Sequence, residues 1–254
     1  MHIIDRYAYS NAIRELDPAQ KGGLALLALL LCLALDQPVV GLLTLAWMFA
    51  LATLWARVPA RAFGRALLAE APFLLLSLVG VALSVSLAPL AGPALQFGPL
   101  WIGSSAESLA LATRLFTRAV GCAAALNFLI LTTPLLDLIE LLRRLRVPET
   151  LIDLMSLTYR AIFVLLESLQ RMATAQDARL GYAGPRRALR SAGLLGSQLF
   201  LDAYRRSQRL QMALESRGLA GPLRVLPLDY RRDWRARWFG AALAASLLLA
   251  GAWR

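Results

Sequence analysis

The sequence predicts an all-α integral membrane protein with about five transmembrane helices and long amphipathic helices on the cytosolic side. Three observations support this fold class. Of the 254 residues, 58% are hydrophobic and 17% are charged, whereas soluble domains average about 45–50% apolar and about 25% charged residues. The hydrophobic residues form separate runs, each close to the ~20 residues that a helix needs to cross a bilayer. The arginines gather between these runs, as they do in cytosolic loops.

The apolar runs are interpreted as the membrane-spanning helices, and they cover residues 22–35, 38–56, 71–90, 107–131 and 238–253. Only Asp36 and Gln37 separate the first two runs, which predicts a tight helical hairpin. We therefore expect three parts: an N-terminal membrane domain with four spans (1–133), a cytosolic insert of helices (134–237) and a C-terminal span (238–254).

The positions of arginine and lysine predict the orientation of the chain. Positive residues of the N-terminal segment and of the second-to-third loop are Arg6, Arg14, Lys21, Arg57, Arg61 and Arg65, whereas loops 36–37 and 91–106 carry none. Because cytosolic loops retain positive charge, we expect the N-terminus in the cytosol and, after five crossings, the C-terminus outside. The insert, with 18 arginines and 10 acidic residues, then lies in the cytosol. We expect a multi-pass protein of a bacterial inner membrane, without a cleaved signal peptide, because its first residues are polar and mixed in charge.

A helical period of 3.6 residues predicts three helices in the insert: 135–146, 149–180 and 186–216. Thr133 is expected to cap the first helix, with Pro134 as its first residue, and Pro148 ends it. The other two helices are longer than the typical 10–14 residues. Each carries an apolar stripe that can lie on a membrane bundle while the far end reaches a cytosolic partner.

The two long helices end alike. The first ends in Asp177-Ala178-Arg179-Leu180 and the second in Glu215-Ser216-Arg217-Gly218, and an Ala-Gly-Pro sequence follows each. One interpretation is that arginine in a last turn favours the negative end of the helix dipole, by about 0.3–1 kcal/mol. The repetition favours a second interpretation, in which the small residue permits close approach and the guanidinium binds an acidic groove of a partner.

These endings resemble the two Ala-Arg-Gly-like triplets of the transmembrane T component of energy-coupling factor (ECF) transporters. The matching residues are Ala178, Arg179, Leu180, Ser216, Arg217 and Gly218. The stretch 17–21, Asp-Pro-Ala-Gln-Lys, and the Thr-Thr-Pro entry to the insert at 132–134 are also similar to that family. The opening residues 4–11 resemble its cobalt branch, called CbiQ. The resemblance covers nearly the whole chain.

The resemblance implies an importer with several subunits. Two ABC-type ATPase subunits are expected to bind the triplets, and a separate substrate-specific membrane subunit is expected to bind the cargo. In the cobalt branch that cargo is Co2+ for cobalamin biosynthesis, while a nickel or vitamin importer is the alternative. One departure from the pattern is Leu180, which stands where the family has glycine.

The composition argues against a metal site, a nucleotide site and a catalytic site in this chain. Its only histidine is His2 and its two cysteines, Cys32 and Cys122, lie in apolar runs, so we expect no metal site. Lys21 is the only lysine and no phosphate-binding glycine loop contains it, so ATP is expected to bind the partner ATPase and no cofactor to bind here. No serine has a neighbouring histidine, and we expect no catalytic residue. The apolar runs also argue against nucleic-acid binding despite the net charge of +11. A membrane enzyme active on its own and a purely structural scaffold are the competing functions.

Arg114 and Arg118 stand four residues apart on one face of the fourth span. Charged residues inside a membrane generally face protein or water, so these arginines are candidates for contact with the substrate-specific subunit. The alternative is that the span begins late and both lie at its outer interface. The following run of small residues, 121–125, suits close helix packing.

Overall fold

The structure is a computed structural model that describes residues 3–82, 84–86, 94–97, 100–103, 106–218, 221 and 230–252. The chain divides into two compact units. One unit, here called the membrane unit, contains Met1–Asp137 and Asp229–Arg254, and the other, the insert unit, contains Leu138–Leu228.

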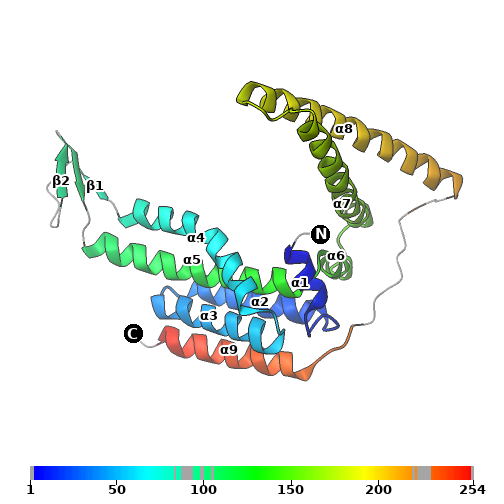
Figure 1. The fold of residues 1–254 in the computed structure, drawn as a ribbon. Helices are drawn as coiled ribbons and strands as arrows, with labels where there is room; N and C mark the ends of the chain where they lie inside the picture. Colours follow the sequence, from blue (N-terminus) through cyan, green and yellow to red (C-terminus); the bar gives the residue numbers. More distant parts are fainter. Residues whose placement is uncertain are drawn as a thin grey trace. The chain divides into compact units, whose positions relative to one another are not determined.

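In the membrane unit, proline and carboxylate caps mark the starts of several helices. Its helices are α1 (Ile3–Ser10), α2 (Pro18–Ala34), α3 (Pro38–Ala50) with its π-helical continuation η1 (Leu51–Trp55), α4 (Ala60–Ala82), α5 (Ala106–Thr132) and α9 (Trp234–Ala252) (Figure 1). Proline occupies the first turn of α2 and α3, where its missing N–H is not needed. Asp17 caps α2 by accepting a hydrogen bond from the Ala19 amide at 3.1 Å.

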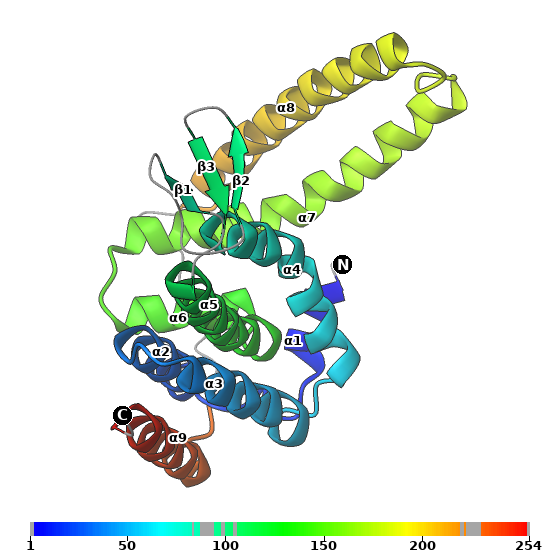
Figure 2. The same cartoon turned by 90° about the vertical axis from the view of Figure 1, so that its left-hand side faces the viewer.

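Helix α5 is the centre of this unit and packs against α1, α2, α3 and α4, while α9 packs against α2 and α3 (Figures 1 and 2). The crossing of α3 and α5 is close because glycines meet there. A Cβ atom added to Gly121 would lie 2.8 Å from the Gly41 carbonyl oxygen and 2.9 Å from the Cys32 sulfur. The small-residue run therefore serves helix packing, as the sequence suggested.

Three of the described helices are long and apolar enough to cross a membrane, namely Pro38–Trp55, Ala60–Ala82 and Ala106–Thr132. The apolar helix α2 has 17 residues and falls just short of that length. Helix α9 is not in this set, and two arginines, Arg235 and Arg237, lie in its first turn. Helix α4 exposes large apolar side chains, among them Leu68, Phe73 and Leu76. Such a surface suits contact with lipid. The predicted helical membrane fold is confirmed, apart from the short strands described next.

The third span differs from its prediction at both ends. Helix α4 begins at Ala60, eleven residues before the predicted 71, and ends at Ala82 rather than at Leu90. A small antiparallel sheet follows it, formed by β1 (Ser84–Ser86), β2 (Ala94–Phe97) and β3 (Leu100–Gly103) in the order β1-β3-β2. The last residues of the predicted span, 87–90, lie outside the described residues.

The helices of the insert match the prediction closely. They are α6 (Leu135–Arg144), which begins in the membrane unit, α7 (Glu149–Ala178) and α8 (Pro185–Ser216). The predicted cap of α6 is wrong, because within the described part of the chain the buried Thr133 hydroxyl makes no hydrogen bond. The Asp137 amide instead donates to the Pro134 carbonyl at 3.1 Å.

The glycine crossing predicts a marked difference between two alanine substitutions. Gly121→Ala should destabilise the chain by about 1–3 kcal/mol, because the new methyl meets backbone of α3 that must shift. Gly80→Ala in α4 is the matched control, since a Cβ atom there meets nothing within 4 Å. Thermal unfolding of the purified variants in detergent measures both, and an equal effect of the two substitutions would refute the close crossing.

Candidate functional site

Both predicted triplets form the ends of long helices. Helix α7 ends at Ala178 and helix α8 at Ser216, so that Arg179 and Arg217 are the C-cap residues. Their backbone conformations agree, with φ −96° and ψ 14° at Arg179 and φ −91° and ψ 7° at Arg217. The two arginines therefore leave their helices in the same geometry.

The residue after each arginine adopts the left-handed conformation, with φ +57° at Leu180 and φ +68° at Gly218. In this conformation the Leu180 amide donates to the Asp177 carbonyl at 2.9 Å, and the Gly218 amide donates to the Glu215 carbonyl at 2.9 Å. Such a turn satisfies carbonyl groups that the helix end leaves unpaired. The leucine at the third position of the first triplet thus keeps the backbone geometry that glycine has at the second.

The turn that follows α7 is held in place by the start of α8. The Gly181 amide donates to the Gln176 carbonyl at 2.8 Å, which completes the Schellman pattern of the helix end. The Ser191 hydroxyl of α8 donates to the Gly181 carbonyl at 3.0 Å. A Cβ atom at Gly181 would lie 2.6 Å from the Ser191 oxygen, so a side chain there would displace this hydroxyl.

The structure keeps the two arginines apart. Arg179 lies at the turn between α7 and α8, whereas Arg217 follows the far end of the 32-residue α8, a helix about 48 Å long (Figure 2). Both side chains are exposed. The site is therefore a pair of separate guanidinium groups, each able to form charge-assisted bonds with carboxylates of a partner.

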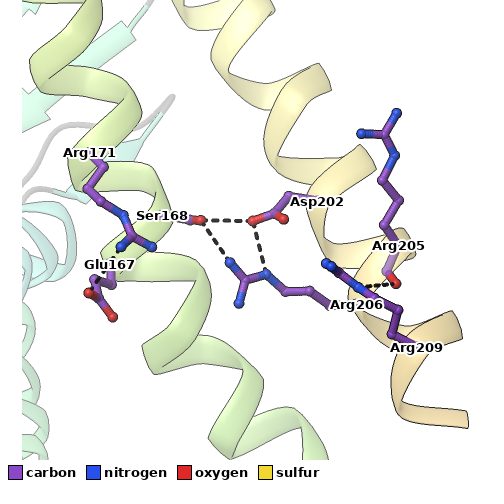
Figure 3. A network of polar contacts seen from close by, with 7 residues as sticks. All are labelled: Glu167, Ser168, Arg171, Asp202, Arg205, Arg206 and Arg209. Atoms are coloured by element: carbon purple, nitrogen blue, oxygen red, sulfur yellow. Dashed lines mark hydrogen bonds and ion pairs between the residues drawn. The ribbon is translucent and has the colours of Figure 1, made fainter. Parts of the chain in front are cut away.

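A polar network joins α7 to α8 between these two ends (Figure 3). The Ser168 hydroxyl, on the buried side of α7, donates to an Asp202 carboxylate oxygen at 2.8 Å. Arg206 binds the same oxygen through Nε at 3.1 Å and lies 3.3 Å from the Ser168 oxygen through Nη2. These hydrogen bonds fix the distance between the two helices at this level.

Only part of this network can be predicted from the sequence. The spacing of Asp202 and Arg206, four residues apart, was a readable signal for an ion pair within α8. Nothing in the sequence indicated that Ser168, 34 residues earlier, would join them. The Arg206 and Ser168 hydrogen bonds lower the pKa of Asp202, so its carboxylate stays charged over the physiological range.

Arg114 and Arg118, the candidates for contact with the substrate-specific subunit, have different surroundings. Arg118 forms an ion pair with Asp36 in the α2–α3 loop, with Nη2 at 3.0 Å from the carboxylate. That loop is expected outside the membrane, which supports the interpretation that Arg118 lies at the outer interface. Arg114 is exposed.

Among the residues that the structure describes, no group of three or more His, Cys, Asp and Glu side chains could hold a metal ion. An open groove of about 670 Å³ does lie between α7 and α8, lined on the α7 side by residues such as Leu157 and Val164 and on the α8 side by residues such as Leu210 and Leu214. It is mostly apolar, which suits a protein surface or a lipid chain better than an ion.

Comparisons with known proteins agree on one family. A family model described as CbiQ, cobalt transport protein, matches residues 9–226. The cobalt transport protein CbiQ of Salmonella typhimurium is 30% identical over 224 residues, which cover 84% of this chain and 94% of that protein. The CbiQ of Rhodobacter capsulatus is 42% identical over 132 residues, 52% of this chain and 54% of that protein. A putative fused cobalt transport protein CbiMQ of Methanocorpusculum labreanum is 28% identical over 221 residues, which cover 85% of this chain but 36% of the fusion.

The left-handed conformation of the third residue in each triplet predicts opposite effects of two substitutions. Leu180→Gly should raise the stability of the insert by up to about 1 kcal/mol, because a left-handed leucine pays a steric cost that glycine avoids. Gly218→Ala should lower it by about the same amount. Thermal unfolding with circular dichroism compares them, and a shift of the same sign in both variants would contradict the matched geometry.

The lowered pKa of Asp202 predicts a pH dependence for the pairing of α7 and α8. A carboxylate with a depressed pKa stabilises the fold above its ordinary value of 3.8, and the stabilisation is lost as the pH falls below that value toward the lower pKa of the folded state. Distances between spin labels on exposed positions of α7 and α8 should therefore broaden only below about pH 4. Asp202→Asn should show the broadened distribution already at neutral pH, and an unchanged distribution in that variant would contradict the role of the network.

Proposed function

This chain belongs to the CbiQ family of cobalt transport proteins, and we propose that it is the membrane subunit that couples a separate ATPase to cobalt uptake. It is a membrane component of cobalt transport. The coupling role is our inference, and the observation that carries it is the matched pair of arginine helix ends in the insert unit.

The matched ends support two equivalent docking sites. Arg179 and Arg217 are exposed cap residues with the same backbone conformation, and each is followed by a left-handed residue. A helix dipole needs only a positive charge near the last turn, which does not require equal conformations at both ends. Two equal sites about 48 Å apart along α8 suit two copies of one partner. We propose that ABC-type ATPase subunits, which bind the ATP, are this partner.

The cargo is proposed to bind a separate membrane subunit. One relative is described as a putative fused cobalt transport protein, CbiMQ, and this chain covers 36% of it. That relative therefore has a CbiQ-like part and a further part in one chain. Apolar side chains of the insert unit that remain exposed, such as Leu154, Ile162 and Phe200, offer surface for such a subunit. We place the chain as a multi-pass protein of the inner membrane, with a cytosolic N-terminus and an external C-terminus, because its arginines follow the positive-inside rule.

The docking proposal predicts the effect of reversing two charges. Arg179→Glu with Arg217→Glu should weaken binding of the ATPase at least about 100-fold. Each new carboxylate would meet the like charge of an acidic groove on the ATPase. Co-purification of the ATPase with the tagged chain, followed by ATP-driven cobalt uptake into vesicles, measures the loss.

The control is Arg190→Glu with Arg209→Glu, which changes the net charge equally at exposed positions inside α8. That variant should retain both binding and uptake. Normal binding and uptake by the Arg179 and Arg217 variant, with normal insertion in the membrane, would refute the proposal.

A further inference from the structure

The only lysine of the chain, Lys21, is fully buried at the start of α2. Its ammonium group donates to the carbonyl oxygens of Arg14 and Thr132, each at 3.2 Å. The carboxylates of Asp137 and Asp17 add electrostatic attraction. Burying an ammonium group costs several kcal/mol unless hydrogen bonds and opposite charges compensate. The position of this charge is therefore specified by its surroundings.

The Thr132 carbonyl, at the last residue of α5, receives two donors. Besides Lys21 it accepts a hydrogen bond from the Asn11 side chain at 3.0 Å, and the same amide nitrogen donates to the Ala8 carbonyl at 2.7 Å. Carbonyl groups at a helix C-terminus lack partners within the helix and carry partial negative charge. The N-terminal segment is thus fastened to the end of α5, where the chain leaves the membrane unit.

One hydrogen bond joins the segment that precedes the insert to the segment that follows it. Asp137 is the last residue of the membrane unit before the insert, and Asp229 is the first residue after it. The Tyr230 hydroxyl donates to an Asp137 carboxylate oxygen at 3.0 Å. Burial raises the pKa of Asp137, while the Tyr230 hydrogen bond and the Lys21 charge act in the opposite direction. We call Asn11, Lys21, Thr132, Asp137 and Tyr230 the root cluster.

The returning segment is also fixed by backbone bonds. The Arg231 amide donates to the Glu15 carbonyl at 2.8 Å, and the Asp17 amide donates to the Arg231 carbonyl at 3.0 Å. Gln20 exchanges two side-chain hydrogen bonds with the backbone of Asp233, both at 3.1 Å. Both ends of the insert are therefore attached to the same place, beside the first turn of α2.

We propose that the root cluster is the rigid attachment through which a displacement of the insert reaches α2 and α5, with Lys21, Asp137 and Tyr230 as positioning residues for coupling. This inference rests on the proposed coupling function. A flexible attachment would absorb the displacement within the connecting segments. An attachment in which entry, exit, N-terminal segment and α5 share hydrogen bonds passes it to the membrane helices instead.

The test measures ATP hydrolysis and cobalt uptake separately in the reconstituted complex of this chain with its ATPase and substrate-binding subunits. Tyr230→Phe removes the hydroxyl and keeps the ring. The variant should bind the ATPase and hydrolyse ATP as the natural chain does, while uptake per ATP falls about fivefold, as expected from one lost hydrogen bond. Lys21→Met should lower the ratio further. Asp137→Asn keeps an acceptor for Tyr230 but loses the negative charge that attracts Lys21, so it should lower the ratio as well.

Tyr204→Phe on α8 is the control, since its ring is exposed and lies outside the root cluster. It should leave uptake per ATP unchanged. An unchanged ratio in Tyr230→Phe and Lys21→Met, beside normal uptake by the natural chain, would overturn the proposal and leave the ATPase docking intact.

Hydrogen–deuterium exchange of the purified chain separates this inference from the coupling function. In Tyr230→Phe the amides of residues 12–17 and 230–233 should exchange faster together, whereas those at the far ends of α7 and α8 should not change. Unchanged exchange at the attachment would overturn the inference. If the natural chain binds no ATPase, the coupling function fails, while the exchange measurement still decides whether the attachment is rigid.

Discussion

The central constraint in this protein is the need to end two helices of about thirty residues in water with their last carbonyl groups satisfied. Both helices meet it in the same way, with an arginine as cap and a left-handed residue after it. Because the cap geometry is the same, the backbone places Arg179 and Arg217 equally relative to the axes of their own helices. In our proposal these two matched ends are equal recognition sites for a partner present in two copies.

Several hydrogen bonds lie between these two ends and at the attachment of the insert. Helix α8 separates the two arginines, and the Ser168–Asp202–Arg206 network holds α7 against it at one level. Ser191 joins the first turn to the same helix. At the other end of the insert the chain enters and leaves beside the buried Lys21. Local hydrogen bonds thus hold α7 to α8 within the insert, and they hold the residues at which the insert begins and ends to α2 and α5.

The helices and the arginine pair could be predicted from sequence because their signals are local. Pro148 and Pro185 mark helix starts, and the apolar period locates α7 and α8 to within two residues of the predicted bounds. The start of α4 could not be read from hydropathy, since its first turns carry Arg61 and Arg65 and read as a loop. The strands between α4 and α5 are short and pair across a loop. The burial of Lys21 depends on residues more than a hundred positions away, which no local pattern reveals.

The most direct test of the account places a photo-cross-linking amino acid at Leu180 in one sample and at Ser216 in another, with Leu189 on α8 as reference. Leu180 and Ser216 are each adjacent to one of the two arginines, whereas Leu189 lies near the start of α8, between the arginines in the sequence. Leu180 and Leu189 are exposed. In membranes that contain the ATPase, we expect capture of that subunit from Leu180 and from Ser216, and none from Leu189. Capture from neither end, or equal capture from Leu189, would contradict the claim that the two arginine helix ends are the docking sites.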